Sequence, residues 1–269
     1  MKTNRPEILH YLTFKIETFM IKIILLLSLT ATLNAQNINE KIIAASREGK
    51  IEDLNTYLKS DSADLNYKDQ TGYTALDYAV EWYQLPAFIR LIEYTESKSK
   101  NADSNSEVEK LNQFVFAILQ NDSSKISNFL TDGINVNQKH HSGYYPLSLA
   151  IRWHFIPITE MLLKNGAKVN VRNTNRYNTT PLMEATRNGS VRVGKLLIKY
   201  GAEINVGDIN NDPAINWAVF FGYTDFVKLL LDNGSRSDMK GIDSGDDAMA
   251  IAKRLGHTDI IKLLESSTK

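Results

Sequence analysis

The chain has 269 residues, and its 31 lysines and arginines balance its 31 aspartates and glutamates, so the formal net charge is zero. A neutral chain lacks the excess positive charge that attracts nucleic acid or acidic membrane surfaces, so we expect neither as a partner. There is no cysteine, which excludes disulfides, thiol nucleophiles and cysteine-ligated zinc or iron–sulfur sites.

The first 35 residues are typical of a secretory signal peptide. Residues 23–33 are nearly all apolar, Lys15 and Lys22 precede them, and Ala35 offers a small residue at the expected cleavage point. This run of about 11 residues is shorter than the roughly 20 that cross a bilayer as a helix, so we expect cleavage rather than a membrane anchor. Met20 is an alternative start. We therefore expect an exported mature chain, residues 36–269, periplasmic or extracellular if the source is bacterial.

One alanine recurs through the remainder of the chain at intervals of 33 to 38 residues. An apolar residue stands three positions before each alanine, and this spacing places both on the same face of a helix. The small alanine would let a neighbouring helix approach closely. The pairs are Ile42 and Ala45, Leu76 and Ala79, Phe114 and Ala117, Leu147 and Ala150, Leu182 and Ala185, Ile215 and Ala218, and Met249 and Ala252.

A glycine follows the alanine after 16 residues in four of these copies and closes a leucine- or phenylalanine-containing segment: Gly133, Gly166, Gly201 and Gly234. Glycine in this place commonly ends a helix. Before the alanine, Thr180-Pro181 and Tyr145-Pro146 are typical of helix starts. Each copy is therefore predicted to form a helix, a tight turn, a second helix and an extended loop.

These marks resemble the ankyrin repeat family. Residues 69–79 (DQTGYTALDYA) and 180–185 (TPLMEA) are similar to the start of its unit, and residues 226–234 (FVKLLLDNG) to its second helix. The resemblance extends over residues 38–267 and implies an all-α repeat solenoid of about seven helix pairs joined by β-hairpin loops. The expected units are 36–68, 69–102, 107–139, 140–174, 175–207, 208–241 and 242–269.

The chain departs from the family pattern in two ways. The histidine of the motif is replaced in every copy, for example by Asp77, Ser148, Met183 and Asn216, which predicts weaker hydrogen bonding between repeats. Gly194 falls inside a predicted second helix, where glycine costs about 1 kcal/mol relative to alanine.

No pattern of catalytic residues is present. Residues 189–196 (GSVRVGKL) approach a phosphate-binding loop, but Leu196 stands where that loop needs Ser or Thr. His140 and His141 are adjacent in a segment expected to be extended, so their side chains should point to opposite sides rather than to one ion. We therefore expect no catalytic residue, no cofactor and no metal, and a chain that is not an enzyme.

In ankyrin proteins the hairpin tips and the exposed end of the first helix line a concave face that contacts partners. Trp, Tyr, Phe and Arg are enriched at the centres of such interfaces. The competing interpretation is that Trp82, Trp153 and Phe221 pack between repeats. The resemblance assigns these partner-binding candidates: Tyr73, Glu81, Trp82, Tyr144, Arg152, Trp153, Arg176, Tyr177, Arg187, Phe220, Phe221 and Arg254.

The resemblance implies a non-enzymatic and monomeric scaffold that binds a protein partner on this concave face, and the leader at residues 1–35 implies that it is exported. Two alternatives stay open. One is an inhibitor or immunity protein that blocks a partner enzyme with the same surface. The other is a small-ligand-binding protein or enzyme that uses the groove.

Overall fold

The computed structural model describes residues 37–98, 107–175, 177–242 and 244–267. The expected signal peptide and Arg176 therefore lie outside the described residues. The chain divides into two compact units, Met1–Thr95 and Glu96–Lys269, which we describe separately. None of the helices in the described ranges is both long and apolar enough to cross a membrane.

The first unit contains a helix at residues 37–48, α2 (Ile51–Tyr57), α3 (Ala75–Glu81) and most of α4 (Leu85–Lys98). Helix α3 begins where Thr74 caps it: the Thr74 hydroxyl accepts a hydrogen bond from the Asp77 backbone N–H at 3.2 Å, and the Thr74 backbone N–H donates to the Asp77 carboxylate at 3.0 Å. This reciprocal capping satisfies two backbone donors and sets the start of the helix.

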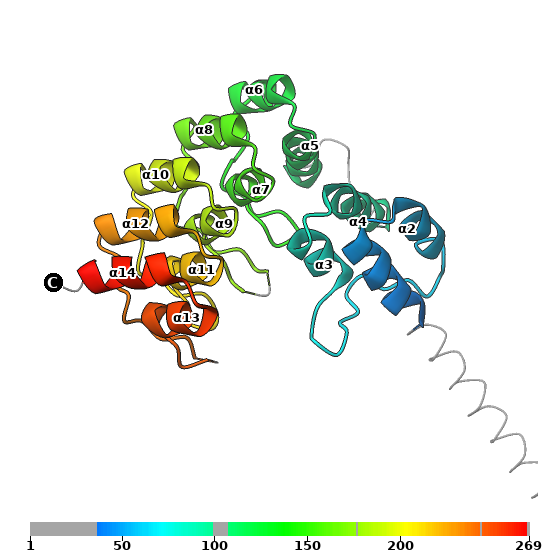
Figure 1. Cartoon of the computed structure of the whole chain (residues 1–269). Coiled ribbons are helices and arrows are strands. Elements are labelled where there is room, and N and C mark those ends of the chain that lie inside the picture. Colours follow the sequence, from blue (N-terminus) through cyan, green and yellow to red (C-terminus); the bar gives the residue numbers. More distant parts are fainter. Residues whose placement is uncertain (1–36, 99–106, 176, 243, 268–269) are drawn as a thin grey trace, which may run out of the picture. The chain divides into compact units, whose positions relative to one another are not determined.

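The second unit is a stack of helix pairs arranged in two rows (Figure 1). One row holds the first helix of each pair and the other row holds the second, and neighbouring helices pack on one another along most of each row. The first helices are α5 (Glu107–Leu119), α7 (Pro146–Arg152), α9 (Pro181–Arg187), α11 (Ala214–Phe220) and α13 (Ala248–Leu255), and the second helices are α6 (Ser123–Thr131), α8 (Ile156–Lys164), α10 (Val191–Lys199), α12 (Thr224–Asp232) and α14 (Thr258–Ser267).

The seven recurrent alanines are all buried, and none exposes more than 3% of its surface. The residue four positions after each alanine has a positive φ and turns the chain between the two helices. Glycine takes this conformation at no steric cost, but three of the seven turns use other residues. The turn residues are Gly49, Tyr83, Asn121, His154, Gly189, Gly222 and Gly256. The common register of the alanines and the turns confirms an all-α fold built from repeats.

Hydrogen bonding between neighbouring repeats is extensive, although the motif histidine is absent. Three asparagines, each three residues before a hairpin loop, reach the following repeat. There the side-chain N–H₂ donates to a backbone carbonyl and the side-chain oxygen accepts a backbone N–H. The contacts are Asn137 with Gly166 and Lys168, Asn170 with Gly201 and Glu203, and Asn205 with Gly234 and Arg236, at 2.7–3.0 Å. Asn216, in the histidine position, itself donates to the carbonyl of Met239 at 3.2 Å. Neighbouring repeats are therefore joined by asparagine side chains in the absence of the motif histidine.

Gly194 has a packing role that its sequence position did not reveal. A Cβ at this position would lie 2.7 Å from Cζ of Phe226 and 2.9 Å from Cδ2 of Leu229. Both of these side chains are buried on α12. Glycine at this point allows α10 and α12 to approach each other, so its cost in helix propensity is offset by close packing.

Candidate protein-interaction surface

The hairpin loops of the second unit form a continuous edge beside the first helices. Each loop is closed by a backbone hydrogen bond, for example from His140 N to Tyr144 O at 2.9 Å and from Asp208 N to Asp212 O at 3.0 Å. Neighbouring loops are joined in turn, because Ile209 N donates to Tyr177 O at 2.9 Å. Backbone bonds of this kind hold the loop side chains in fixed positions relative to the helices.

An array of aromatic rings lies where the loop carrying Tyr177 meets α11. The centroids of Tyr177 and Trp217 are 5.5 Å apart, and those of Trp217 and Phe221 are 6.5 Å apart, both pairs edge-to-face. Phe221 also contacts Phe220 at 5.3 Å and stacks on Tyr223 at 5.7 Å. These separations are those of favourable aromatic pairs. We call these five residues the aromatic cluster.

Arg187, at the end of α9, contacts two rings of the aromatic cluster. Its guanidinium lies 5.6 Å from the ring centroid of Trp217 and 6.0 Å from that of Tyr177, within cation–π range. The Trp217 indole N–H donates to the Asp208 carboxylate at 3.2 Å. Burial is the largest influence on Asp208, and it raises the pKa of this carboxyl above its ordinary value.

The outer part of the aromatic cluster is open to solvent. Phe220 exposes 54% of its surface and Phe221 exposes 38%. Exposed aromatic rings that pack on half-buried neighbours, as these do on Trp217 and Tyr223, can bury apolar area against a partner with little loss of side-chain entropy. The arrangement therefore offers a binding surface, and it contains no nucleophile–base pair.

The comparison with protein families agrees with this architecture. The family model described as Ankyrin repeats (3 copies) matches residues 114–208. Residues 114–208 therefore carry ankyrin repeats. No curated protein matches the sequence. Ankyrin repeats generally mediate protein–protein interaction, and proteins built from them are typically scaffolds rather than enzymes.

Four of the candidate partner residues that the ankyrin resemblance assigned are buried: Tyr144, Arg152, Trp153 and Arg187. Arg152 exposes 1% and Trp153 exposes 8% of their surfaces. The prediction that these side chains lie on an open surface is wrong, because α7 and α9 are packed between neighbouring repeats on both sides. For Trp153 the competing interpretation, packing within the repeats, describes its position.

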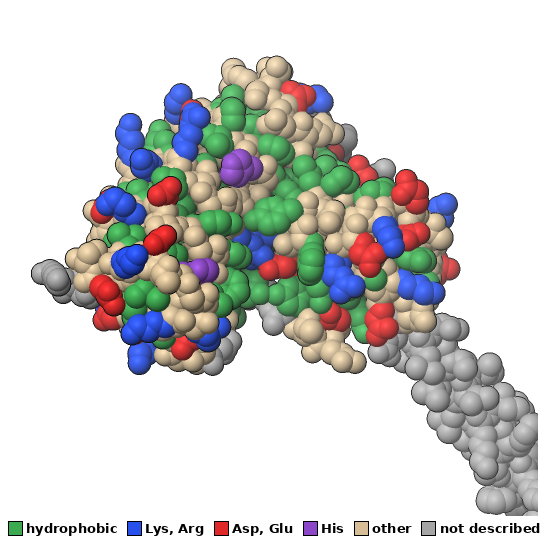
Figure 2. Space-filling model, in the orientation of Figure 1, with side chains coloured by type: hydrophobic (Ala, Val, Ile, Leu, Met, Phe, Trp, Pro, Cys, Tyr) green, Lys and Arg blue, Asp and Glu red, His purple; other side chains and the backbone are tan. Residues whose placement is uncertain are grey.

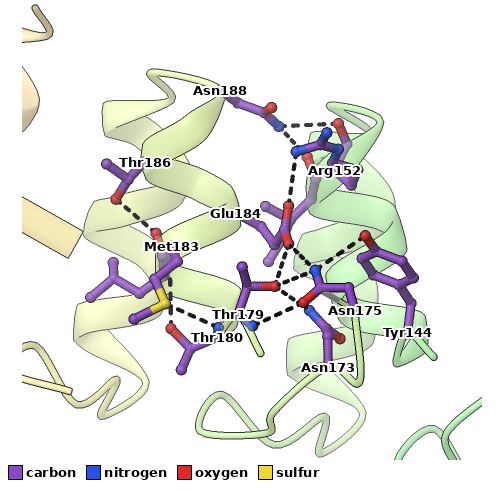
Figure 3. A network of polar contacts seen from close by, with 12 residues as sticks. Tyr144, Arg152, Asn173, Asn175, Thr179, Thr180, Met183, Glu184, Thr186 and Asn188 are labelled. Atoms are coloured by element: carbon purple, nitrogen blue, oxygen red, sulfur yellow. Dashed lines mark hydrogen bonds and ion pairs between the residues drawn. The ribbon is translucent and has the colours of Figure 1, made fainter. Parts of the chain in front are cut away.

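Arg152 belongs to a buried polar network that joins α7 to α9 (Figure 3). Its guanidinium donates to Oε2 of Glu184 at 3.2 Å, and both side chains are 1% exposed. Oε1 of Glu184 accepts from the Thr179 hydroxyl at 2.5 Å and from the Asn175 side-chain amide at 3.4 Å. The same amide donates to the Tyr144 hydroxyl at 3.1 Å. Two predicted partner residues, Arg152 and Tyr144, are thus structural members of one ankyrin-repeat core.

The remaining candidates are accessible to different degrees. Trp82 in the first unit is 57% exposed, while Tyr73 is half-buried and packs on Tyr78 at 4.9 Å. Glu81 is half-buried. In the second unit the exposed Arg254 donates to Asp246 at 3.0 Å.

Two members of the aromatic cluster, Trp217 and Tyr223, were absent from the sequence-based candidates. Trp217 directly precedes the recurrent Ala218, and Tyr223 directly follows the turn glycine Gly222. Aromatic residues at both places, in the copy that already carries Phe220 and Phe221, were a signal in the sequence. Only the fold shows that Tyr177, in the neighbouring loop, packs against Trp217.

A second surface feature is a shallow basic groove on the other row of helices. Figure 2 shows Lys and Arg side chains gathered over α8 and α10. The groove has a volume of about 450 Å³ and is lined by Glu160, Val191, Arg192, Lys195, Leu196 and Lys199. Arg192 pairs with Glu160 at 2.7 Å, and its side chain is largely exposed. Solvated cations of this kind are typical of an ordinary repeat surface.

The two adjacent histidines do not point apart as expected. The residues 140–143 form a tight turn, in which Gly143 N donates to His140 O at 3.0 Å, rather than an extended segment. The imidazole rings of His140 and His141 consequently lie on the same side, with centroids 3.9 Å apart, and both face Glu96. Burial lowers the pKa of His140 and outweighs the opposing attraction of the Glu96 carboxylate.

Proposed function

We propose that this ankyrin repeat protein is a scaffold that binds a protein partner on the aromatic cluster of Tyr177, Trp217, Phe220, Phe221 and Tyr223. The observation that carries the proposal is the exposure of Phe220 and Phe221 within an array of mutually contacting rings. Aromatic residues with rigid support are enriched among the residues that dominate binding energy at protein interfaces.

In the proposed mechanism, the packed repeats hold the aromatic rings in fixed positions before a partner binds. Arg187 and the Trp217–Asp208 hydrogen bond limit the rotamers of the inner rings before any partner arrives. When a partner binds these rings, this protein therefore loses little side-chain conformational entropy. The arginine supports the rings from the buried side rather than contacting the partner itself.

We propose further that the protein is exported, to the periplasm or the extracellular space if the source is bacterial. The support is the apolar run at residues 23–33 with Ala35 after it, together with the absence of cysteine. Mass-spectrometric analysis of the extracytoplasmic fraction tests this directly. A mature N-terminus at residue 36 is the expected result, and an intact leader retained in the cytoplasm would contradict it.

The test of the binding surface is quantitative capture from the extracytoplasmic fraction of the producing cell, using the wild type and the double variant Phe220→Ala/Phe221→Ala. Both rings are exposed, so the double variant should keep the wild-type helical signal and melting temperature within a few degrees. We expect it to lose at least about tenfold in affinity for the captured protein.

The matched control is Tyr200→Ala, because Tyr200 is an exposed aromatic residue next to α10, away from the aromatic cluster. This variant should capture the partner as the wild type does. Equal binding by all three proteins would contradict the assignment of the surface, whereas loss in both variants would indicate non-specific adhesion to exposed rings.

A further inference from the structure

Three side chains with metal-binding atoms meet at one point of the second unit. They are Glu96, near the end of α4, and His140 and His141, at the start of a hairpin loop. Oε1 of Glu96 lies 3.8 Å from Nε2 of His140 and 3.5 Å from Nε2 of His141. One ligand atom from each residue lies within 4.8 Å of the other two. Zinc bonds of about 2.0–2.2 Å in tetrahedral geometry separate ligand atoms by about 3.3 Å, so small side-chain rotations bring this set together.

The His140 side chain gives independent evidence for a ligand at this point. It is fully buried, and its Nε2 has no hydrogen-bond partner within the described ranges of the chain. The 3.8 Å separation from Glu96 is too long for a hydrogen bond. Buried polar atoms in native proteins nearly always have a partner, because an unpaired one costs about 1–3 kcal/mol. A cation between His140, His141 and Glu96 would supply that partner.

The other nitrogen of His140 is already held in place. Its Nδ1 lies 2.9 Å from the Ser142 hydroxyl, which can accept a hydrogen from Nδ1 and leave the Nε2 lone pair directed toward Glu96. The Ser142 backbone N–H can instead donate to Nδ1 at 3.2 Å, which would place the ring hydrogen on Nε2. A metal bound at Nε2 would select the tautomer that carries its hydrogen on Nδ1. A hydrogen-bonded second nitrogen of this kind is the usual support of a metal-binding histidine.

We propose that Glu96, His140 and His141 form a binding site for one zinc ion, with the fourth position open to water. Two imidazoles and one carboxylate suit a zinc-type dication, whereas calcium and magnesium prefer ligand sets made of oxygen alone. The site is separate from the aromatic cluster and does not depend on the proposed partner. Zinc bound there would fix the hairpin loop at residues 140–144 and stabilise the second unit.

The experiment titrates zinc into the full chain, purified without a polyhistidine tag, in competition with a chromophoric chelator, and magnesium serves as the negative control ion. We expect one zinc per chain, a higher melting temperature with zinc, and the intense visible absorption of tetrahedral cobalt when cobalt replaces zinc. His141→Gln and Glu96→Gln should each weaken zinc binding at least about tenfold. His141 and Glu96 are partly exposed, so these variants should fold.

The control variant is His154→Asn. His154 is exposed, lies outside the cluster and has φ of 63°, a conformation that asparagine tolerates. It should bind zinc as the wild type does. Absence of zinc binding at millimolar concentration would overturn the proposal, as would unchanged affinity in both His141→Gln and Glu96→Gln. Loss of binding in those two variants with retention in His154→Asn supports it.

Discussion

Helix propensity and side-chain packing predict opposite effects on stability for a substitution at Gly194. Helix propensity alone says that Gly194→Ala should stabilise α10 by about 1 kcal/mol. The new Cβ would instead approach Phe226 to 2.7 Å and Leu229 to 2.9 Å, and both neighbours are buried. We expect overpacking to prevail, with a net loss of roughly 1–3 kcal/mol in the free energy of unfolding.

Chemical denaturation of the Gly194→Ala variant measures this loss. The control is Lys195→Ala, one position along the same helix and exposed to solvent, which should change stability by less than about 0.5 kcal/mol. A stabilised Gly194→Ala variant would mean that α12 moves aside freely and that the close approach of the helices is not required.

Asp69 predicts a pH dependence in the first unit. Burial on its own would raise the pKa of this carboxyl, but hydrogen bonds from the Thr71 and Tyr78 hydroxyls and from the backbone N–H groups of Tyr73 and Thr71 hold it at about 2, against an ordinary value of 3.8. The folded-state pKa is depressed, so the stabilisation is present above about pH 4 and is lost as the pH falls toward 2. Solvent exposure keeps the effect modest.

The measurement compares melting temperatures of the wild type and Asp69→Asn between pH 6 and pH 2. The wild type should melt higher near neutral pH, and the difference should shrink below pH 4 as Asp69 takes up a proton. A difference that stays constant down to pH 2 would show that the Asp69 contacts do not depend on its charge.

At the scale of elements, a buried ion pair links neighbouring repeats. Arg152 on α7 and Glu184 on α9 are both almost fully buried. Removing one partner leaves the other as a buried charge without the opposite charge beside it, which costs about 3–5 kcal/mol, whereas removing both leaves no such charge. Arg152→Met and Glu184→Met should therefore each destabilise strongly, and the double variant should lose clearly less than the sum of the two.

A double-mutant cycle by denaturant unfolding gives the coupling between these two residues. The result also decides the role of Arg152 in binding. If either single variant melts like the wild type but loses the captured partner, Arg152 would act at the surface, against its burial in the structure.

The asparagine contacts between repeats carry a second prediction at this scale. Asn170 donates to the carbonyl of Gly201 and accepts from the N–H of Glu203, at 3.0 and 2.9 Å. Asn170→Ala removes both contacts, and we expect a loss of about 1–2 kcal/mol in stability. Asn165→Ala is the control, because its side chain bonds only to the carbonyl of Met161 within its own repeat among the described contacts. Equal losses would show that reaching the next repeat adds nothing.

At the scale of the second unit, each helix pair packs mainly on its immediate neighbours, as α11 does on α9 and α13. In such an array a local change spreads only to adjacent repeats. Removing residues 242–269, which hold α13 and α14, should therefore lower amide protection in α11 and α12 while leaving α7 and α8 nearly unchanged. Hydrogen exchange measures this, and uniform loss of protection would indicate one fully cooperative core.

The repeated architecture could be predicted from the residue pattern alone. The recurrent alanines and the turn residues four positions later form one periodic pattern, and periodic burial follows directly from periodic sequence because each repeat packs on a near copy of itself. The burial of Ala185 and Ala218 could therefore be predicted from spacing alone.

The exposure of the large aromatic and charged side chains could not be predicted from the residue pattern, because it depends on packing between segments that are distant in the chain. Trp153 and Phe221 each stand three residues after the recurrent alanine, in two copies separated by one other copy, yet Trp153 is buried and Phe221 is exposed. Exposure depends on the neighbouring loops, which differ between repeats in length and in side chains. The same reason explains His140 and His141, whose rings share one side because a tight turn, set by contacts across the loop, replaces the extended backbone that local sequence suggested.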